Sequence, residues 1–273
     1  MMEIIKAILF GIVEGITEWL PISSTGHMIL LNEFVRLDVS EEFWQMFLVV
    51  IQLGAILAVV LLFWEKIFPF NFKGGSIIKA DTFLLWGKII AACIPAAIVG
   101  ILLDDFLDKY LYNYTVVSIA LIVFGIAFLI IEEKNKGKAP RINSLSEITW
   151  NTALIIGIFQ LIAAVFPGTS RSGATIVGAL LLGVSRTVAA EFTFFLAIPV
   201  MLGASLLKLL KFGFSFTSME AIILLTGMAV AFLVSIIVIR FLMGYIKKHD
   251  FKVFGWYRIA LGALVLTYFG LFA

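Results

Sequence analysis

The sequence predicts an all-α integral membrane protein, and three observations carry this prediction. Of the 273 residues, 62% are hydrophobic and only 14% are charged, and the mean hydropathy is +1.11. Six apolar runs are long enough to cross a bilayer, which takes about 20 mostly apolar residues per helix. Two further apolar stretches are interrupted in the middle by Pro, Gly and hydroxyl residues. The six predicted spans lie near 42–64, 82–103, 112–132, 188–207, 219–243 and 253–272.

The two interrupted stretches, 4–31 and 149–183, are expected to form re-entrant helical hairpins. Irregular backbone at membrane depth is tolerated only inside protein or beside a cavity. The positive-inside rule places the basic loop 133–147 in the cytoplasm, together with the basic segment 244–252. The acidic loop 33–42 then falls outside, provided that each hairpin returns to the side from which it entered. Both termini are therefore expected outside.

The two interrupted stretches also resemble each other, which predicts an inverted-topology repeat. Three predicted spans follow each copy, so the second copy must lie upside down relative to the first. Aligning 11–24 with 157–170 pairs Glu14 with Gln160, Pro21 with Pro167, Ser23 with Thr169 and Ser24 with Ser170. We expect a single transmembrane domain, 1–273, with repeat one at about 1–132, a cytoplasmic linker at about 133–147 and repeat two at about 148–273.

Three features of other protein classes are not expected: a cleavable signal peptide, a cysteine-based disulfide or metal cluster, and a nucleic-acid partner. A cleavable signal peptide is not predicted, because Glu14 and Glu18 occupy the place of its apolar core. Cys93 is the only cysteine, so neither an internal disulfide nor a thiolate metal cluster is expected. The expected surroundings are membrane lipids, and no nucleic-acid partner is predicted.

Glu14 and Glu18 are the most informative residues in the chain. A carboxylate in the middle of an apolar span costs roughly 2.5–3.5 kcal/mol on insertion scales. Residues four apart lie on one helical face, so two carboxylates there also repel each other. A chain retains such a pair where a cation, a proton or a bound substrate offsets the cost.

The segments that follow the two interruptions have the composition of anion-binding helix starts. A helix N-terminus carries unpaired N–H groups and a partial positive charge. Hydroxyl side chains donate hydrogen bonds, and the guanidinium of Arg171 matches a phosphate group with two parallel donors. The predicted substrate-binding residues are Ser23, Thr25, Gly26, Gly168, Thr169, Ser170, Ser172 and Gly173.

Two glutamates beside a phosphate site require a cation between them and the ligand. Mg²⁺ and Ca²⁺ both take carboxylate and phosphate oxygens, so Glu14 and Glu18 are the predicted ligands of a divalent cation. In phosphoryl transfer, Ser24 or a water molecule would attack, with His27 as acid or base. Arg171 would stabilise the developing charge. Its main alternative role is structural, as the counter-ion of Glu18.

These motifs resemble the two signature regions of the BacA-type undecaprenyl pyrophosphate phosphatases. The first region is Glu14-x3-Glu18 followed by PISSTGH from Pro21 to His27, and the second is PGTSRSGAT from Pro167 to Thr175. The resemblance extends along the whole chain.

The resemblance implies a phosphoric anhydride hydrolase that converts undecaprenyl diphosphate into undecaprenyl phosphate and inorganic phosphate. Such proteins act at the outer side of the bacterial cytoplasmic membrane, recycle the lipid carrier for peptidoglycan, require a divalent cation and are associated with bacitracin resistance. By position, Glu14 and Glu18 are the paired acids, Ser24 the candidate nucleophile, His27 the acid/base and Arg171 the phosphate ligand. The resemblance leaves open Mg²⁺ against Ca²⁺, the nucleophile, the lipid chain length and a homodimer.

Two other functions compete with this one. A transporter or flippase of a polyprenyl phosphate also uses broken helices in an inverted repeat, but it gains little from two extra negative charges. A phosphatase of the phosphatidic-acid type needs a second catalytic histidine after the Ser-Arg pair, and none follows Arg171 before His249. Arg258 and Glu191, which lie in or beside predicted spans, are as readily structural partners as site residues.

Overall fold

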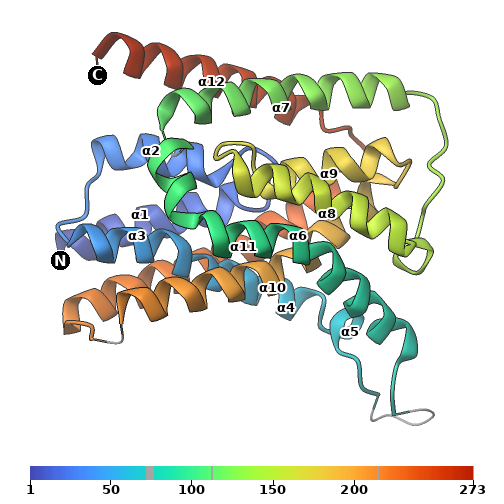
Figure 1. Ribbon diagram of the computed structural model, residues 1–273, viewed down its shortest axis with the longest axis horizontal. Helices are drawn as coiled ribbons and strands as arrows, with labels where there is room; N and C mark the ends of the chain where they lie inside the picture. Colours follow the sequence, from blue (N-terminus) through green and yellow to red (C-terminus); the bar gives the residue numbers. More distant parts are fainter. Residues whose placement is uncertain (72–76, 112, 214, 273) are drawn as a thin grey trace.

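The computed structural model describes residues 1–71, 77–111, 113–213 and 215–272, and the described chain is built from helices (Figure 1). The helices are α1 Met2–Thr17, α2 Ser24–Phe34, α3 Glu41–Val50, α4 Gln52–Leu62, α5 Trp64–Ile67, α6 Ala80–Leu111, α7 Tyr114–Asn135, η1 Leu145–Glu147, α8 Trp150–Val165, α9 Arg171–Leu181, α10 Arg186–Phe212, α11 Ser218–Tyr245 and α12 Lys252–Phe272. The predicted all-α fold class is thereby confirmed.

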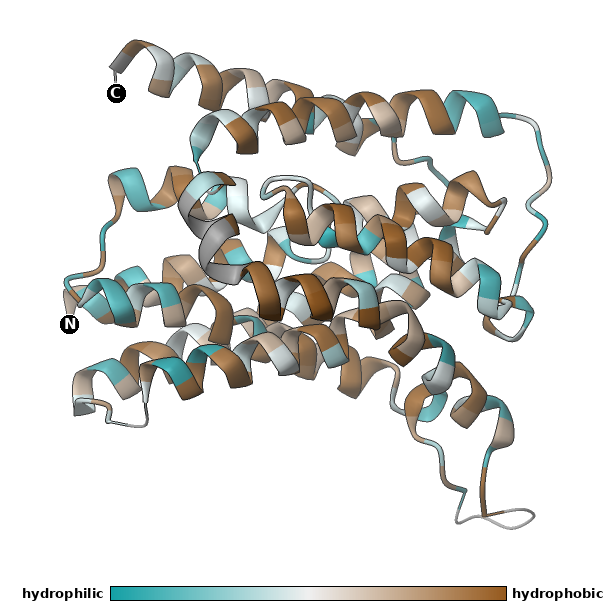
Figure 2. Ribbon diagram, viewed as in Figure 1, coloured by the Kyte–Doolittle hydropathy of each residue, from teal (hydrophilic) through white to brown (hydrophobic). Residues whose placement is uncertain are grey.

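The predicted membrane spans are also confirmed. Within the described ranges, six helical segments are long and apolar enough to cross a membrane: Glu41–Leu62, Ala80–Leu103, Tyr114–Asn135, Arg186–Phe212, Ser218–Tyr245 and Lys252–Leu271. Hydrophilic residues gather toward the two ends of the molecule and hydrophobic ones between them (Figure 2). The first span differs from the expected single helix, because a turn at Ile51 divides it into α3 and α4.

Six of the described helices begin at a side-chain cap, and the caps of α3, α7, α8 and α11 explain where these four segments start. Ser40 accepts a hydrogen bond from the N–H of Phe43, and Asn113 accepts one from that of Val116. The other two caps are Thr149 at α8 and Thr217 at α11, where Glu220 completes a capping box. Each cap satisfies one of the N–H groups that the first turn leaves without a partner.

The first interrupted stretch forms a hairpin, α1–α2, whose two ends lie together. The ammonium of Lys6 donates to the carbonyl of Arg36 at 2.6 Å. The carboxylate of Glu3 accepts from the backbone N–H of Asp38 at 2.8 Å. The start of α1 and the segment after α2 are therefore tied at one end of the molecule.

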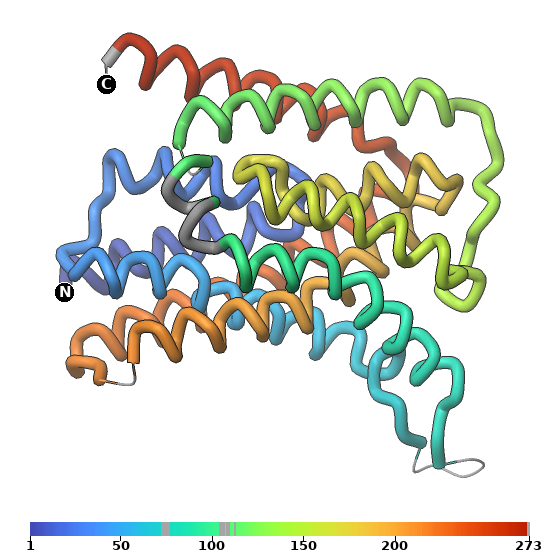
Figure 3. Tube along the Cα trace, viewed as in Figure 1, coloured from blue at the N-terminus to red at the C-terminus, as the bar shows by residue number. Residues whose placement is uncertain are grey.

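The second interrupted stretch, α8–α9, forms a similar hairpin, and the base of this hairpin lies at the opposite end of the molecule (Figure 1). The segment before α8 is tied to the segment after α9. The N–H of Arg141 donates to the carbonyl of Gly183 at 2.7 Å, and the N–H of Ser185 donates to the carbonyl of Ile142 at 2.8 Å. The hairpin tips consequently meet inside the helix bundle, while both chain termini lie at the end that holds the base of α1–α2 (Figure 3).

The two halves of the chain interdigitate. Helix α1 packs along α11, and α8 packs along α6, so each hairpin lies against a span of the other half. Glycines permit the close approach of α8 to α6 and a further one of α4 to α11. A Cβ on Gly157 would lie 2.3 Å from the carbonyl oxygen of Ala92, and one on Gly54 would lie 2.1 Å from that of Met228.

Helices α9 and α10 lie at the centre of the bundle. Residues 172–180 of α9 and 188–198 of α10 are all buried. The buried rings of Phe194 and Trp19 meet edge to face at 5.2 Å, which packs α10 against the tip of the first hairpin. The hairpin tips are therefore surrounded by protein.

An ionic cluster fixes the helix ends next to the linker. The buried carboxylate of Glu132 accepts from Arg186 Nε at 2.9 Å and from the N–H of Phe251 at 3.0 Å. Glu133 pairs with Lys252. The C-terminal end of α7 is thus joined to the N-terminal ends of α10 and α12.

The close approach of α4 to α11 generates a stability prediction. The variant Gly54→Ala places a methyl group against backbone, which side-chain rotation cannot relieve. We expect it to lower the unfolding free energy by about 1–3 kcal/mol. The measurement is the thermal unfolding midpoint of the detergent-purified protein. Gly203→Ala in α10 is the control, because a Cβ there meets nothing within 4 Å. Equal midpoints for the two variants would contradict the close crossing of α4 and α11.

Candidate active site

The two hairpin tips share an unusual backbone feature. Ser23 has φ 74° and Ser170 has φ 68°, and they are the only non-glycine residues with positive φ in the described ranges. Each caps the helix that follows: Ser23 Oγ accepts from the N–H of Gly26 at 3.4 Å, and Ser170 Oγ accepts from that of Gly173 at 3.2 Å. Such conformations cost about 1–3 kcal/mol each and are concentrated at functional sites.

This geometry corrects the alignment of the two repeats by one residue. The predicted pairing of Ser24 with Ser170 is wrong at the tip, because Ser23 and Ser170 hold the same cap position. The second tip contains one more residue between its proline and its cap. Ser24 and Arg171 consequently occupy the same position, the first residue of α2 and of α9.

Glu18, Ser24 and Arg171 form one hydrogen-bonded group between the tips. Arg171 Nη2 donates to Glu18 Oε1 at 2.9 Å, and Ser24 Oγ donates to Glu18 Oε2 at 2.8 Å. The side chains of Glu18 and Arg171 are only 7% and 12% exposed. Burial strengthens this ion pair, and three of the four predicted catalytic residues are thereby brought together.

The guanidinium of Arg171 is held from a second side. Its Nη1 donates to the carbonyl of Thr193 at 2.8 Å, and the Thr193 hydroxyl lies 2.8 Å from that of Thr175. Arg171 Nε is buried and has no hydrogen-bond partner among the described residues. Arg171 thus keeps one N–H donor that the described protein does not satisfy.

Glu14 lies one helical turn before Glu18 and is 1% exposed. It is within Coulombic range of both Glu18 and Arg171. Its Oε1 is buried without a partner in the described structure. In the second repeat Gln160 takes the same place, and both polar atoms of its amide are likewise buried without a partner among the described residues.

The predicted cation ligands fit a hard divalent cation in their donor chemistry. Glu14 offers an unpartnered carboxylate oxygen, and Glu18 retains lone pairs beyond its two hydrogen bonds. Mg²⁺ and Ca²⁺ prefer such oxygen ligands. Within the described residues no group of three or more His, Cys, Asp or Glu side chains gathers around one point. Further ligands would come from hydroxyl or amide oxygens, water or substrate phosphate.

His27 is bonded away from the Glu18 group. Its Nδ1 lies 2.7 Å from the carbonyl oxygen of Ser23, and its Nε2 lies 2.7 Å from the hydroxyl of Tyr257 on α12. Neither bond goes to Ser24 or Glu18. The predicted acid/base thus borders the group without joining it.

Arg258 of α12 holds the two tips together. Its side chain is fully buried, and it donates to the carbonyls of Pro21 at 3.2 Å, Gly168 at 3.0 Å and Thr169 at 2.7 Å. No carboxylate pairs with it in the part of the chain that the structure describes. Glu191 is the other residue that was expected either in the site or as a structural partner. It binds Lys66 at 2.7 Å and is a structural partner.

The predicted substrate-binding residues all lie at the tips, in different roles. Ser172 Oγ donates to the backbone carbonyl of Glu18 at 3.1 Å. Thr169 Oγ1 is buried without a partner among the described residues, whereas Thr25 is half-buried.

The predicted glycines lie at the same tips. Gly168 has φ +89° and packs on the backbone of Val117, a position that admits no side chain. Gly26 and Gly173 lie in the first turns of α2 and α9, beside the caps Ser23 and Ser170.

Three residues that shape the site were not predicted as members: Gln160, Thr193 and Tyr257. Gln160 carried a signal, because it aligned with Glu14. Thr193 acts through its backbone carbonyl, which no sequence pattern marks. Tyr257 lies 230 residues from His27 in the chain.

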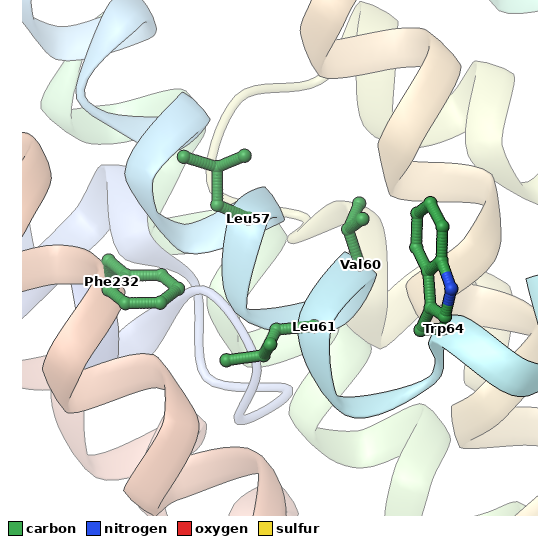
Figure 4. Close-up of a pocket in the computed structure, with 5 residues that line it drawn as sticks. All are labelled: Leu57, Val60, Leu61, Trp64 and Phe232. Atoms are coloured by element: carbon green, nitrogen blue, oxygen red, sulfur yellow. The ribbon is translucent and has the colours of Figure 1, made fainter.

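A separate apolar pocket lies on the outer face of α4 and α11. It has a volume of about 310 Å³ and is lined by Leu57, Val60, Leu61, Trp64 and Phe232 (Figure 4). None of these residues belongs to the Glu18 group. Its lining is apolar apart from the indole nitrogen of Trp64, and it holds no carboxylate, hydroxyl or imidazole for chemistry.

The chain is similar to known proteins along nearly its whole length. An undecaprenyl-diphosphatase of Desulfitobacterium hafniense is 69% identical over 269 residues, which are 98% of this chain and 97% of that protein. Undecaprenyl-diphosphatase 1 of Clostridium acetobutylicum is 71% identical, with 98% and 97% covered, and an undecaprenyl-diphosphatase of Enterococcus faecalis is 64% identical, with 97% and 96% covered. The family model of the bacitracin resistance protein BacA matches residues 7–264, and the chain belongs to this family.

Proposed function

We propose that this chain hydrolyses undecaprenyl diphosphate to undecaprenyl phosphate and inorganic phosphate, as the names of its relatives state for them. The reaction returns a lipid carrier to cell-wall synthesis. The observation that carries the proposal is the Ser24 hydroxyl bonded to Glu18, whose other oxygen is held by Arg171. This group supports Ser24 as the nucleophile, Glu18 as the acceptor of its proton and Arg171 as the cation that binds phosphate.

The binding side of the site is built from two helix starts. Helices α2 and α9 begin at the tips, and their first N–H groups and partial positive charges favour a phosphate. Arg171, at the start of α9, adds a full charge and the unpartnered Nε. The distal phosphate would lie here with its isoprenoid chain extending into lipid.

The chemical side begins with the proton of Ser24. Glu18 Oε2 accepts this hydrogen bond and is placed to take the proton as the serine oxygen attacks the distal phosphorus. The phosphorus–oxygen bond to undecaprenyl phosphate breaks, and the lipid monophosphate leaves. Water then releases inorganic phosphate from the serine. Direct attack by a water bound beside Ser24 uses the same acceptor.

A divalent cation held by Glu14 and Glu18 would offset the repulsion between two carboxylates and a diphosphate. The unpartnered oxygen of Glu14 supports this assignment. When bound, the cation supplies charge neutralisation at the phosphate oxygens. Arg171 stabilises the charge that develops on the transferred phosphoryl group.

The hairpin geometry and the loop charges support the proposed placement in the membrane. Hairpins with bases at opposite ends, and tips that meet inside, support re-entrant hairpins in an inverted repeat. The basic linker 133–147 lies at the end opposite the termini, which supports a cytoplasmic linker with termini and site opening outside. Homodimer formation and the repeat boundaries stay predictions. Transport is not favoured, because carrying a lipid phosphate does not need the Ser24–Glu18 bond.

The hydroxyl and carboxylate of the site should be required for turnover. We expect Ser24→Ala and Glu18→Gln to lower phosphate release from undecaprenyl diphosphate in detergent by at least about 100-fold, the usual size of a general acid–base contribution. Ser118→Ala is the matched control, because this buried serine bonds only to the carbonyl of Tyr114 on its own helix. Near-normal release by Ser24→Ala and Glu18→Gln would contradict the assignment.

The cation should act through Glu14. Chelator should stop phosphate release, and Mg²⁺ or Ca²⁺ should restore it. In Glu14→Gln we expect a higher cation concentration for half-maximal release and weaker Mn²⁺ binding by electron paramagnetic resonance, with the lipid KM little changed. Glu191→Gln is the control, a buried acid whose partner is Lys66. An unchanged cation requirement in Glu14→Gln would rule out this ligand.

A further inference from the structure

We infer that Tyr257 is a positioning residue: its hydroxyl binds Nε2 of His27 and fixes the orientation of the ring at the edge of the active site, in the tautomer that the Ser23 carbonyl selects. The inference rests on the proposed function together with the role that the resemblance implies for His27, an acid or base beside the Glu18–Ser24 pair. Tyr257 lies on α12, at the opposite end of the chain from the hairpin that holds His27.

The tautomer follows from the two bonds of the imidazole ring. His27 Nδ1 lies 2.7 Å from the carbonyl oxygen of Ser23, and a carbonyl only accepts, so Nδ1 carries the proton. In the neutral ring Nε2 then holds the lone pair. The Tyr257 hydroxyl, 2.7 Å from Nε2, therefore donates to it. The two ring planes are nearly parallel, at 4°.

The position of Tyr257 is itself fixed by its neighbour. Arg258 binds the carbonyls of Pro21, Gly168 and Thr169, which anchors this turn of α12 to both tips. Among the described residues, Arg258 is the charged side chain with an electrostatic effect on His27. On the α7 side, the start of α2 meets the apolar side chains of Leu121 and Val117. Arg258 and Tyr257, two consecutive residues of α12, thus hold the two tips and the neighbouring His27 in position.

The hydrogen bond between Tyr257 and His27 has a consequence for the reaction. Ser23, whose carbonyl holds Nδ1, is the strained cap directly before Ser24. Tyr257 is 45% exposed, so its hydroxyl can be reached from outside the bundle. In this tautomer the basic nitrogen of His27 is Nε2, so a proton reaches the ring there, through the Tyr257 hydroxyl that is bonded to it. Tyr257 thereby presents His27 in one orientation.

The chain provides its own control for this inference. It has two histidines, and His249 stacks on Tyr245 with ring centroids 4.6 Å apart. Tyr245→Phe removes a hydroxyl beside His249 without touching the site. Tyr257→Phe removes the hydroxyl that donates to His27 and keeps the ring.

The test is the ¹⁵N NMR spectrum of the detergent-purified protein with ¹⁵N-labelled histidine. The chain has two histidines, and the variant His249→Gln removes one signal and so assigns the other to His27. In the wild type we expect His27 as the Nδ1–H tautomer with a hydrogen-bonded Nε2. Tyr257→Phe should shift the Nε2 signal of His27 and leave His249 unchanged, and Tyr245→Phe should leave His27 unchanged. In the same preparations Tyr257→Phe should lower kcat roughly 3- to 10-fold, the size of one hydrogen bond, with the lipid KM little changed.

Three results would overturn the inference. An Nε2–H tautomer in the wild type would exclude the Tyr257 hydroxyl as the donor, and a His27 signal that does not respond to Tyr257→Phe would exclude the bond. A shifted His27 signal with unchanged kcat would show that the bond has no part in turnover. Absence of phosphate release in the wild type would instead overturn the proposed function, and the spectrum would still decide the tautomer.

Discussion

The ion pair between Glu18 and Arg171 is the interaction on which the rest of the site depends. It joins residues from the two hairpins, 153 positions apart, in a region where both side chains are almost fully buried. A buried charge without its partner costs about 3–5 kcal/mol, so neither hairpin tip can take its position alone. Ser24 and the carbonyl of Thr193 provide further hydrogen bonds to the two members of the pair. The same bonds that stabilise the tips thus orient Ser24, the proposed nucleophile.

The interdigitated fold makes this pairing possible. Each hairpin packs against a span of the other half, and the glycines at the crossings allow backbones to approach closely. The tips are brought to the centre of the bundle, where α9 and α10 exclude water and lipid from the backbone breaks. Arg258 then joins the two loops through their carbonyls. A polar site inside an apolar protein is therefore held by bonds to backbone as much as by side-chain pairs.

Much of this arrangement could be predicted from the sequence, because polar residues in apolar runs are costly and conspicuous. The six spans followed from hydropathy, and the cost of burying Glu14, Glu18 and Arg171 marked them as one site. The contacts of Tyr257 and the backbone carbonyl of Thr193 could not be predicted, since composition does not say which helix face meets a distant hairpin. The repeat alignment failed by one residue at the tips, because a positive-φ serine cap has no distinct sequence signal.

The most direct measurement is a double-mutant cycle on Glu18 and Arg171. Glu18→Gln, Arg171→Gln and the double variant would be unfolded by a denaturing detergent, and their unfolding free energies compared with that of the wild type. If the pair holds the tips together, each single change is destabilising and the double change costs clearly less than their sum, with a coupling energy of about 1–3 kcal/mol. Additive effects, within about 0.5 kcal/mol, would show that the two residues act independently and would contradict a shared site.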